Sequence, residues 1–98
     1  MRLEFDEQAA QELEDATAYY DAKGDDLGER FLHEVGEAIQ RIRAHPKAWA
    51  QVSRRSRRCL LHRFPYGLIY QVREDMILLL AVMHLSRRPG YWRDRETT

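Results

Sequence analysis

Apolar residues in the first half of the chain recur at helical spacing and predict a strand followed by a helix. Residues 2–5 alternate between polar and apolar and predict a short strand, after which Asp6 is placed to cap a helix that ends at about Ala22. Gly24 is placed to serve as the C′ residue of this helix. The acidic positions between the apolar ones, Glu12 among them, are expected on the solvent side. The buried face comprises Ala9, Ala10, Leu13, Ala16, Thr17 and Tyr20.

A second helix is expected to begin after a cap at Asp25 or Asp26 and to end near His45. Pro46 sets this end, because proline disfavours helical geometry in the residue before it. The break between the two helices is so short that they should form an antiparallel hairpin. The buried face of the second helix comprises Leu27, Phe31, Leu32, Val35, Ala38, Ile39 and Ile42.

The second half of the chain predicts three strands, at residues 57–64, 67–73 and 76–85. Two groups of turn residues separate them, Pro65-Tyr66-Gly67 and then Glu74-Asp75. Three strands joined by such short turns form an antiparallel meander.

Two further features of this half complete the expected architecture. Residues 47–56 have no regular pattern and are interpreted as a connecting loop. The run at residues 76–83 has no polar face, so its strand is expected to be central and covered on both sides. The predicted fold is α+β, with an N-terminal short strand and an antiparallel helical hairpin packed on a small, mostly antiparallel sheet. Residues 1–98 are expected to form one domain.

Length and composition fit a small soluble domain. A chain of 98 residues buries roughly 60–65% of the surface that its unfolded form exposes. It contains no apolar run long enough to span a membrane, and its N-terminal residues lack the apolar core of a signal peptide. The single cysteine, Cys59, excludes an internal disulfide and fits a reducing compartment. We therefore expect a cytoplasmic protein.

Charge is distributed unevenly along the chain although the formal net charge is zero. Residues 1–40 hold three Lys or Arg against twelve Asp or Glu, a net charge of −9, and residues 41–98 hold thirteen against four, a net charge of +9. Arginine outnumbers lysine fourteen to two, and its planar guanidinium suits bidentate contact with phosphate or carboxylate. Two oppositely charged, solvated faces would be enough to explain the difference in charge between the two halves. The excess of arginine over lysine, however, favours an anionic partner for the basic half.

The chemistry of the chain concentrates where the last strand is predicted to end, at His84, Arg87, Arg88, Tyr91 and Trp92. Imidazole, guanidinium and aromatic groups suit a phosphodiester or an acidic partner surface. RNA cleavage by the ribose 2′-hydroxyl needs a base, an acid and cations for the charged intermediate. Arginine stays protonated and can only clamp phosphate, so proton exchange is left to His84, His62 and Tyr91. The candidate clamps are Arg58, Arg63, Arg87 and Arg88.

Several of these residues have a purely structural alternative. His84 could be a strand-end histidine that is hydrogen-bonded to a neighbouring loop. Tyr91 and Trp92 either stack on a base or anchor the tail to the core. Arg63 either contacts phosphate or pairs with a helix carboxylate.

Strand geometry and residue spacing limit the remaining candidates. Arg57 and Arg58 are neighbours in a predicted strand and face opposite sides, so only one of them can join a common patch. Cys59 is expected to be a small core residue. The four histidines show no paired spacing, so neither a metal nor another cofactor is expected.

The pattern along nearly the whole chain resembles the RelE/ParE superfamily, the toxins of bacterial type II toxin–antitoxin modules, also known as plasmid stabilisation proteins. The long helical hairpin and the Pro46-x-x-Trp49 sequence at its exit look more like the ParE side of the superfamily. The residues that carry the resemblance are Tyr19-Tyr20, 28–31, His45-Pro46, Trp49, 57–70, 82–84 and 87–92.

The resemblance implies one of two activities. RelE-like members cleave mRNA in the ribosomal A site, and ParE-like members block DNA gyrase. In both groups a cognate antitoxin wraps over the toxin and neutralises it, and the pair represses its own operon. RelE-like toxins use an arginine on the last strand and a later tyrosine, and Arg87 and Tyr91 occupy similar places. They also use lysines before the meander, where this chain offers only Arg54, Arg55, Arg57 and Arg58.

The sequence thus supports three hypotheses. The leading one is a gyrase-binding toxin in a hetero-oligomer with its antitoxin. Its target- or antitoxin-binding residues are expected to be Arg58, Arg63, Arg88 and Trp92. The second is a ribosome-dependent mRNA endonuclease with Arg87, Tyr91 and His84 as catalytic residues. The third is a module that binds an antitoxin without being toxic.

Overall fold

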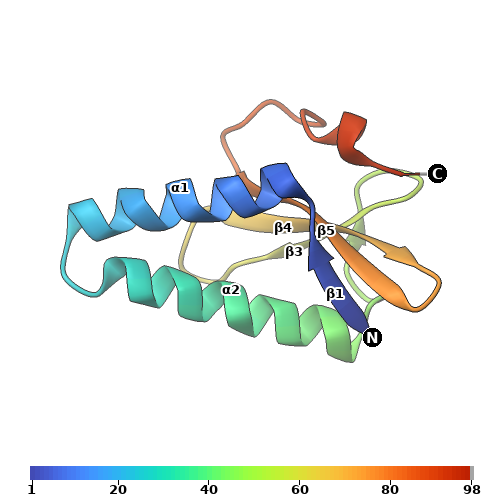
Figure 1. Ribbon diagram of the computed structural model, residues 1–98, viewed down its shortest axis with the longest axis horizontal. Coiled ribbons are helices and arrows are strands. Elements are labelled where there is room, and N and C mark those ends of the chain that lie inside the picture. The colour runs from blue at the N-terminus through green and yellow to red at the C-terminus, as the bar shows by residue number, and fades with distance from the viewer. Residues whose placement is uncertain (98) are drawn as a thin grey trace.

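The chain folds into a five-stranded sheet with an antiparallel pair of helices on one face (Figure 1). The computed structural model describes residues 1–97. The sheet order is β1-β5-β4-β3-β2, in which β1 is parallel to β5 and the other pairs are antiparallel. The elements are β1 (Arg2–Phe5), α1 (Glu7–Lys23), α2 (Leu27–Ala44), β2 (Ala50–Gln51), β3 (Arg57–Leu60), β4 (Tyr66–Arg73), β5 (Met76–His84) and the 3-10 helix η1 (Arg93–Arg95). The predicted fold class is confirmed.

The two helices lie where the apolar spacing predicted them, but their ends differ in detail. Asp6 caps α1, and its side chain accepts hydrogen bonds from the backbone of Gln8 (2.8 Å) and Ala9 (3.3 Å). Gly24 follows α1 with extended backbone (φ 178°), so it does not form the left-handed C′ turn. Asp26 precedes α2 in the left-handed region (φ 66°) and makes no side-chain cap. An aspartate is therefore the N-cap residue of both helices, as predicted, but only Asp6 forms the side-chain hydrogen bonds of a cap.

The connection before the meander contains a strand that the sequence did not predict. Residues 50–51 form β2 and pair with Arg57 and Arg58 of β3. Two residues are too few to show a strand pattern, which explains why residues 47–56 were interpreted as a loop.

The strand β3 is shorter than predicted because α2 holds the chain that follows it. The carboxylate of Glu34 accepts hydrogen bonds from the backbone N–H groups of His62 (2.9 Å) and Arg63 (3.0 Å). These groups are therefore satisfied by a helix side chain and not by a strand. Tyr66, expected in the turn, is instead the first residue of β4.

The apolar strand β5 is covered on both faces, as predicted, but it is not the central strand. It lies between β1 and β4, and β4 occupies the middle of the sheet. A β-bulge shifts the register, because Ile69 pairs with Ala81 and Tyr70 pairs with Leu79. Leu80 is the extra residue, and it changes which residues face the helices.

The sheet divides the core into two clusters, and the bulge places both Leu80 and Ala81 in the outer one. The larger cluster packs between the sheet and the helices and includes Phe31, Ile42, Leu68, Tyr70 and Leu79. The smaller cluster lies on the outer face, where the C-terminal tail covers the sheet; its buried members are Ile69, Leu80, Ala81, Met83 and Trp92. Both faces of the sheet therefore bury apolar side chains.

Neither helix within residues 1–97 is long and apolar enough to cross a membrane.

Candidate functional site

A groove of about 550 Å³ crosses the outer face of the sheet, opposite the helices. Its floor consists of the buried side chains of Ile69, Met83 and Trp92. At its edge, Leu60 and Leu85 are 44% and 45% exposed, so the apolar surface continues from the floor of the groove to its rim. The full lining is Val52, Arg58, Leu60, Ile69, Met83, Leu85, Arg87, Pro89, Gly90, Trp92 and Arg93.

Successive side chains of a strand point to opposite faces of the sheet, so Arg57 and Arg58 of β3 face opposite sides, as predicted. Arg58 is the one that lines the outer groove. The guanidinium of Arg57 donates to the backbone oxygen of Trp49 (2.8 Å). The aliphatic stem of Arg58 lies over Gly67, where an added Cβ would approach Arg58 Cγ to 3.1 Å. Gly67, expected only as a turn residue, therefore gives Arg58 its room. The buried Nε of Arg58 has no hydrogen-bond partner within residues 1–97.

Arg87 lies over the ring of Tyr91, with its guanidinium carbon 3.8 Å from the ring centroid. The Tyr91 hydroxyl donates to Glu12 (2.8 Å). Burial and the hydrogen bond to Glu12 raise the pKa of Tyr91 far above its usual value. The phenol therefore holds its proton firmly, which argues against a role in proton transfer.

His84 is held at the end of β5 by the turn that follows it. Its Nδ1 accepts from the backbone N–H of Ser86 (3.0 Å) and lies 2.8 Å from the Ser86 hydroxyl, and its ring packs edge-on against Tyr66 at 5.0 Å. This is the structural alternative that the sequence allowed for His84. His84 lines a different recess beside α1, together with Glu12 and Asp15, and the lining of that recess also includes Arg87.

The three catalytic candidates are therefore not gathered around one cavity. Arg87 borders both the outer groove and the recess beside α1, whereas His84 borders only the recess and Tyr91 lines neither. An arrangement for 2′-hydroxyl cleavage needs a base and an acid on either side of one phosphate.

The expected binding residues are dispersed as well. Trp92 is only 2% exposed, so its indole anchors the tail and cannot stack on a partner in this structure. Arg63 lies in the loop between β3 and β4, where its backbone, and not its guanidinium, contacts Glu34. Arg88 is exposed in the turn after β5. Of the expected set, Arg58 and Trp92 line the outer groove.

Glu12 is the residue whose role the sequence concealed. Expected on the solvent side of α1, its side chain is only 17% exposed. It accepts hydrogen bonds from the backbone of Val82 (3.0 Å), from the Tyr91 hydroxyl (2.8 Å) and from both terminal nitrogens of Arg95 (3.0 and 3.1 Å). Its partners lie at least 70 positions away in sequence, and no local pattern indicates them.

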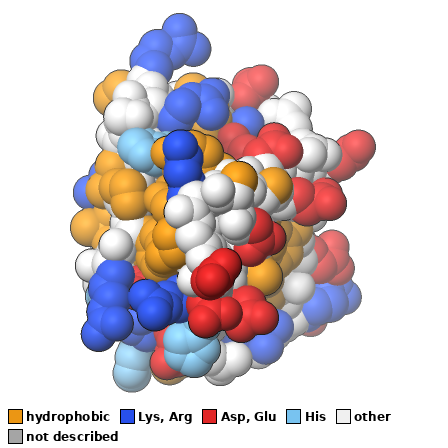
Figure 2. Space-filling model, turned by 90° about the vertical axis from the view of Figure 1, so that its left-hand side faces the viewer, with side chains coloured by type: hydrophobic (Ala, Val, Ile, Leu, Met, Phe, Trp, Pro, Cys, Tyr) orange, Lys and Arg blue, Asp and Glu red, His pale blue; other side chains and the backbone are white. Residues whose placement is uncertain are grey.

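The charge asymmetry of the sequence becomes an asymmetry between faces. Figure 2 shows acidic side chains mainly on the right of that view, and hydrophobic side chains beside clusters of Lys and Arg on the left. Within residues 1–97, none of the groove arginines Arg58, Arg87 and Arg93 forms an ion pair. The outer face therefore combines apolar surface with arginines that form no ion pair among the described residues.

Comparison with known proteins agrees with this architecture. Residues 3–89 match the family described as the ParE toxin of the type II toxin–antitoxin system parDE. The solved structure of the chromosomal ParDE system from P. aeruginosa contains a chain with the same fold, at a TM-score of 0.76 and 18% identity, covering 88% of this chain and 97% of that one. A search of curated proteins gave no significant match. Because the family match spans most of the sequence, this chain belongs to the ParE toxin family of type II toxin–antitoxin systems.

Proposed function

We propose that this protein arrests growth by binding DNA gyrase and that a cognate antitoxin neutralises it by covering the outer groove. The observation that carries the proposal is the groove itself, with its apolar floor and its arginines Arg58, Arg87 and Arg93 free of ion pairs. Such a surface suits an acidic segment with apolar side chains, because guanidinium groups bind carboxylates while the leucines are covered. Membership of the ParE family supports the toxin role.

The same geometry favours binding over mRNA cleavage. The hydroxyl of Tyr91 donates a hydrogen bond to Glu12, and Nδ1 of His84 accepts one from the backbone of Ser86. A guanidinium is a poor general base, so Arg87 suits contact with phosphate and not the removal of a proton from a ribose hydroxyl. A ribosome-dependent nuclease is therefore the weaker hypothesis for this chain.

Growth and gyrase assays test the proposal together. Expression of the chain alone should stop growth, co-expression of the adjacent small gene should restore it, and the purified chain should inhibit supercoiling by gyrase. Unimpaired growth with abundant soluble protein would contradict the toxin role. Codon-phased cuts in ribosome-bound mRNA, without inhibition of gyrase, would instead establish the nuclease.

A matched pair of charge reversals tests the groove. The double variant Arg87→Glu/Arg93→Glu should weaken antitoxin binding by about a hundredfold, since two desolvated charge contacts become repulsive. Arg30→Glu reverses an exposed arginine on α2, away from the groove, and should leave the affinity unchanged. Equal affinities for the two variants would place the antitoxin elsewhere.

A further inference from the structure

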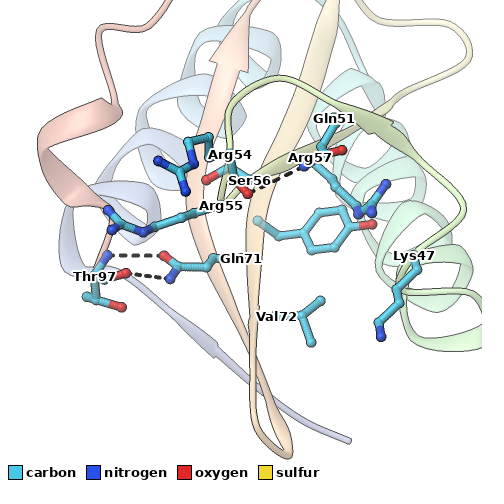
Figure 3. Close-up of a pocket in the computed structure, with 10 residues that line it drawn as sticks. Lys47, Gln51, Arg54, Arg55, Ser56, Arg57, Gln71, Val72 and Thr97 are labelled. Carbon is cyan, nitrogen blue, oxygen red and sulfur yellow. Dashed lines mark hydrogen bonds between the residues drawn. The ribbon is translucent and has the colours of Figure 1, made fainter.

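A second concavity of about 350 Å³ lies at the end of the sheet where β3 begins, apart from the outer groove. In Figure 3 its four cationic side chains, Lys47, Arg54, Arg55 and Arg57, are arranged around the end of β4. Among the described residues, 1–97, no carboxylate side chain lines it. The remaining lining residues are Gln51, Ser56, Tyr70, Gln71, Val72 and Thr97.

The recess exists because β4 extends beyond its neighbour. The pairing of β3 with β4 reaches only from Leu60 opposite Gly67 to Arg57 opposite Tyr70. Beyond this point β4 continues to Arg73 without a strand on the β3 side. The chain before β3 turns away, since the oxygen of Ser56 accepts from the backbone of Val52 (2.9 Å).

The register shows which backbone groups face the recess. Leu61 N donates to Tyr66 O (2.9 Å), and hydrogen-bonded positions alternate along an antiparallel pair. Tyr66, Leu68, Tyr70 and Val72 therefore direct their N–H and C=O groups toward the β3 side. Tyr70 lies opposite Arg57, but no strand residue lies opposite Val72. An open strand edge of this kind is a template for an added strand.

The walls of the recess are fixed before any partner arrives. The hydroxyl of the fully buried Tyr70 donates to the backbone oxygen of Pro46 (2.5 Å). On the other side, the Gln71 side chain and the backbone of Thr97 exchange two hydrogen bonds (2.6 and 3.1 Å), drawn as dashed lines in Figure 3. A preformed site loses little entropy when it binds.

We propose that this recess binds an extended acidic segment of a partner protein, which adds as a strand to the edge of β4 at Val72. Carboxylates of the segment then face Lys47 and Arg54, two exposed cations that form no ion pair within residues 1–97, and Arg55, which forms no ion pair there but whose charge also acts on Glu96. The partner is recognised by its backbone through strand addition and by its charge through the cations. This site requires neither gyrase nor growth arrest, so it can be tested apart from the proposed function.

Binding of a defined peptide to the full chain tests the inference. The probe is a fluorescein-labelled octapeptide of alternating Glu and Val, followed by anisotropy, with an alternating Lys and Val octapeptide as the charge control. A Glu and Val peptide with alternate N-methylated amides keeps the charge but cannot pair as a strand. The acidic peptide should bind, the basic one should not, and N-methylation should weaken binding about tenfold, because backbone pairing is lost.

Variants and a backbone signal locate the binding. The double variant Lys47→Glu/Arg54→Glu should weaken binding of the acidic peptide at least about tenfold, whereas Arg30→Glu should leave the affinity unchanged. In ¹⁵N NMR spectra the amide of Val72 should shift and gain protection from hydrogen exchange. Equal binding by the double variant, equal binding by the N-methylated peptide or an unchanged Val72 amide would each overturn the inference. So would tighter binding of an octathymidylate that displaces the peptide, because the site would then serve nucleic acid.

Discussion

The side chain of Glu12 connects segments of the protein that lie far apart in the sequence. It joins α1 to the backbone of β5 at Val82, to Tyr91 and to Arg95 in the tail. The side chains of Arg95 and Glu12 are only 9% and 17% exposed, so solvent screens this ion pair weakly. Val82 lies beyond the last β1 pairing, Phe5 with Leu79, so Glu12 satisfies an N–H group that no strand reaches.

Replacement of Glu12 by alanine should therefore destabilise the protein strongly. Glu12→Ala leaves the Arg95 guanidinium without its counter-charge and Val82 N–H without an acceptor, at a cost of about 3 kcal/mol in the free energy of unfolding. Urea denaturation followed by circular dichroism measures the loss. The control Glu14→Ala, on the exposed side of the same helix, should change the stability by less than about 0.5 kcal/mol. Similar losses in both variants would show that the contacts of Glu12 with Val82, Tyr91 and Arg95 do not carry the effect, since alanine itself favours the helix.

At the scale of elements, the hairpin between β4 and β5 contains local strain. Its turn residues are Glu74 and Asp75, and Glu74 adopts a positive φ of 46° that side chains rarely favour. Glycine takes this conformation without steric cost, so Glu74→Gly should stabilise the hairpin by about 0.5 kcal/mol, or a few degrees in Tm. Calorimetry should show no such gain for Asp75→Gly, whose φ is not positive. A lower Tm for Glu74→Gly would mean that backbone entropy outweighs the strain.

The elements also show what local sequence could and could not predict. Helical spacing predicted both helices, and Pro46 predicted the end of α2 to within one residue. The bulge at Leu80 was not predictable, because every position of that strand is apolar and a change of phase leaves no trace in the pattern. The early end of β3 depends on Glu34, a distant side chain.

The candidate site, too, was only partly predictable from local sequence. The gathering of Arg87 and Tyr91 after the last strand was predicted, and the two residues are in contact. The burial of Trp92 and the role of Glu12 depend on where the tail crosses the sheet. Such tertiary contacts between distant segments have no periodic signal in sequence.

At the scale of the whole molecule, the helices and the sheet are joined by a C-terminal tail that follows the residues matched by the family. The match ends at residue 89, and the contacts that fix the tail come after it. Trp92 fills the outer core, Arg95 binds Glu12 on the helix layer, and Glu96 accepts hydrogen bonds from Ser53 and Ser56 before β3. The tail thus shapes the outer groove while it connects the helices, the sheet and the β2–β3 loop.

The last of these contacts should make the attachment of the tail sensitive to acid. Burial alone would raise the pKa of the Glu96 carboxyl, but hydrogen bonds from Ser53 and Ser56 and the nearby positive charges of Arg55 and Arg93 lower it below its ordinary value of 4.5. A carboxyl with a lowered folded-state pKa contributes stability that is complete above its ordinary pKa. That stability is lost as the pH falls through the folded-state value.

The variant Glu96→Gln isolates this contribution. The wild type should exceed it in unfolding free energy by a constant amount from about pH 7 to pH 5, and the difference should shrink below about pH 4 as Glu96 becomes protonated. Urea unfolding at a series of pH values measures the difference, and Glu14→Gln on the exposed face of α1 controls for general effects of acid. A difference that stays constant down to pH 3 would show that the charge of Glu96 does not hold the tail. The serine hydroxyls would then contribute through neutral hydrogen bonds, and the outer groove would keep its shape in acid.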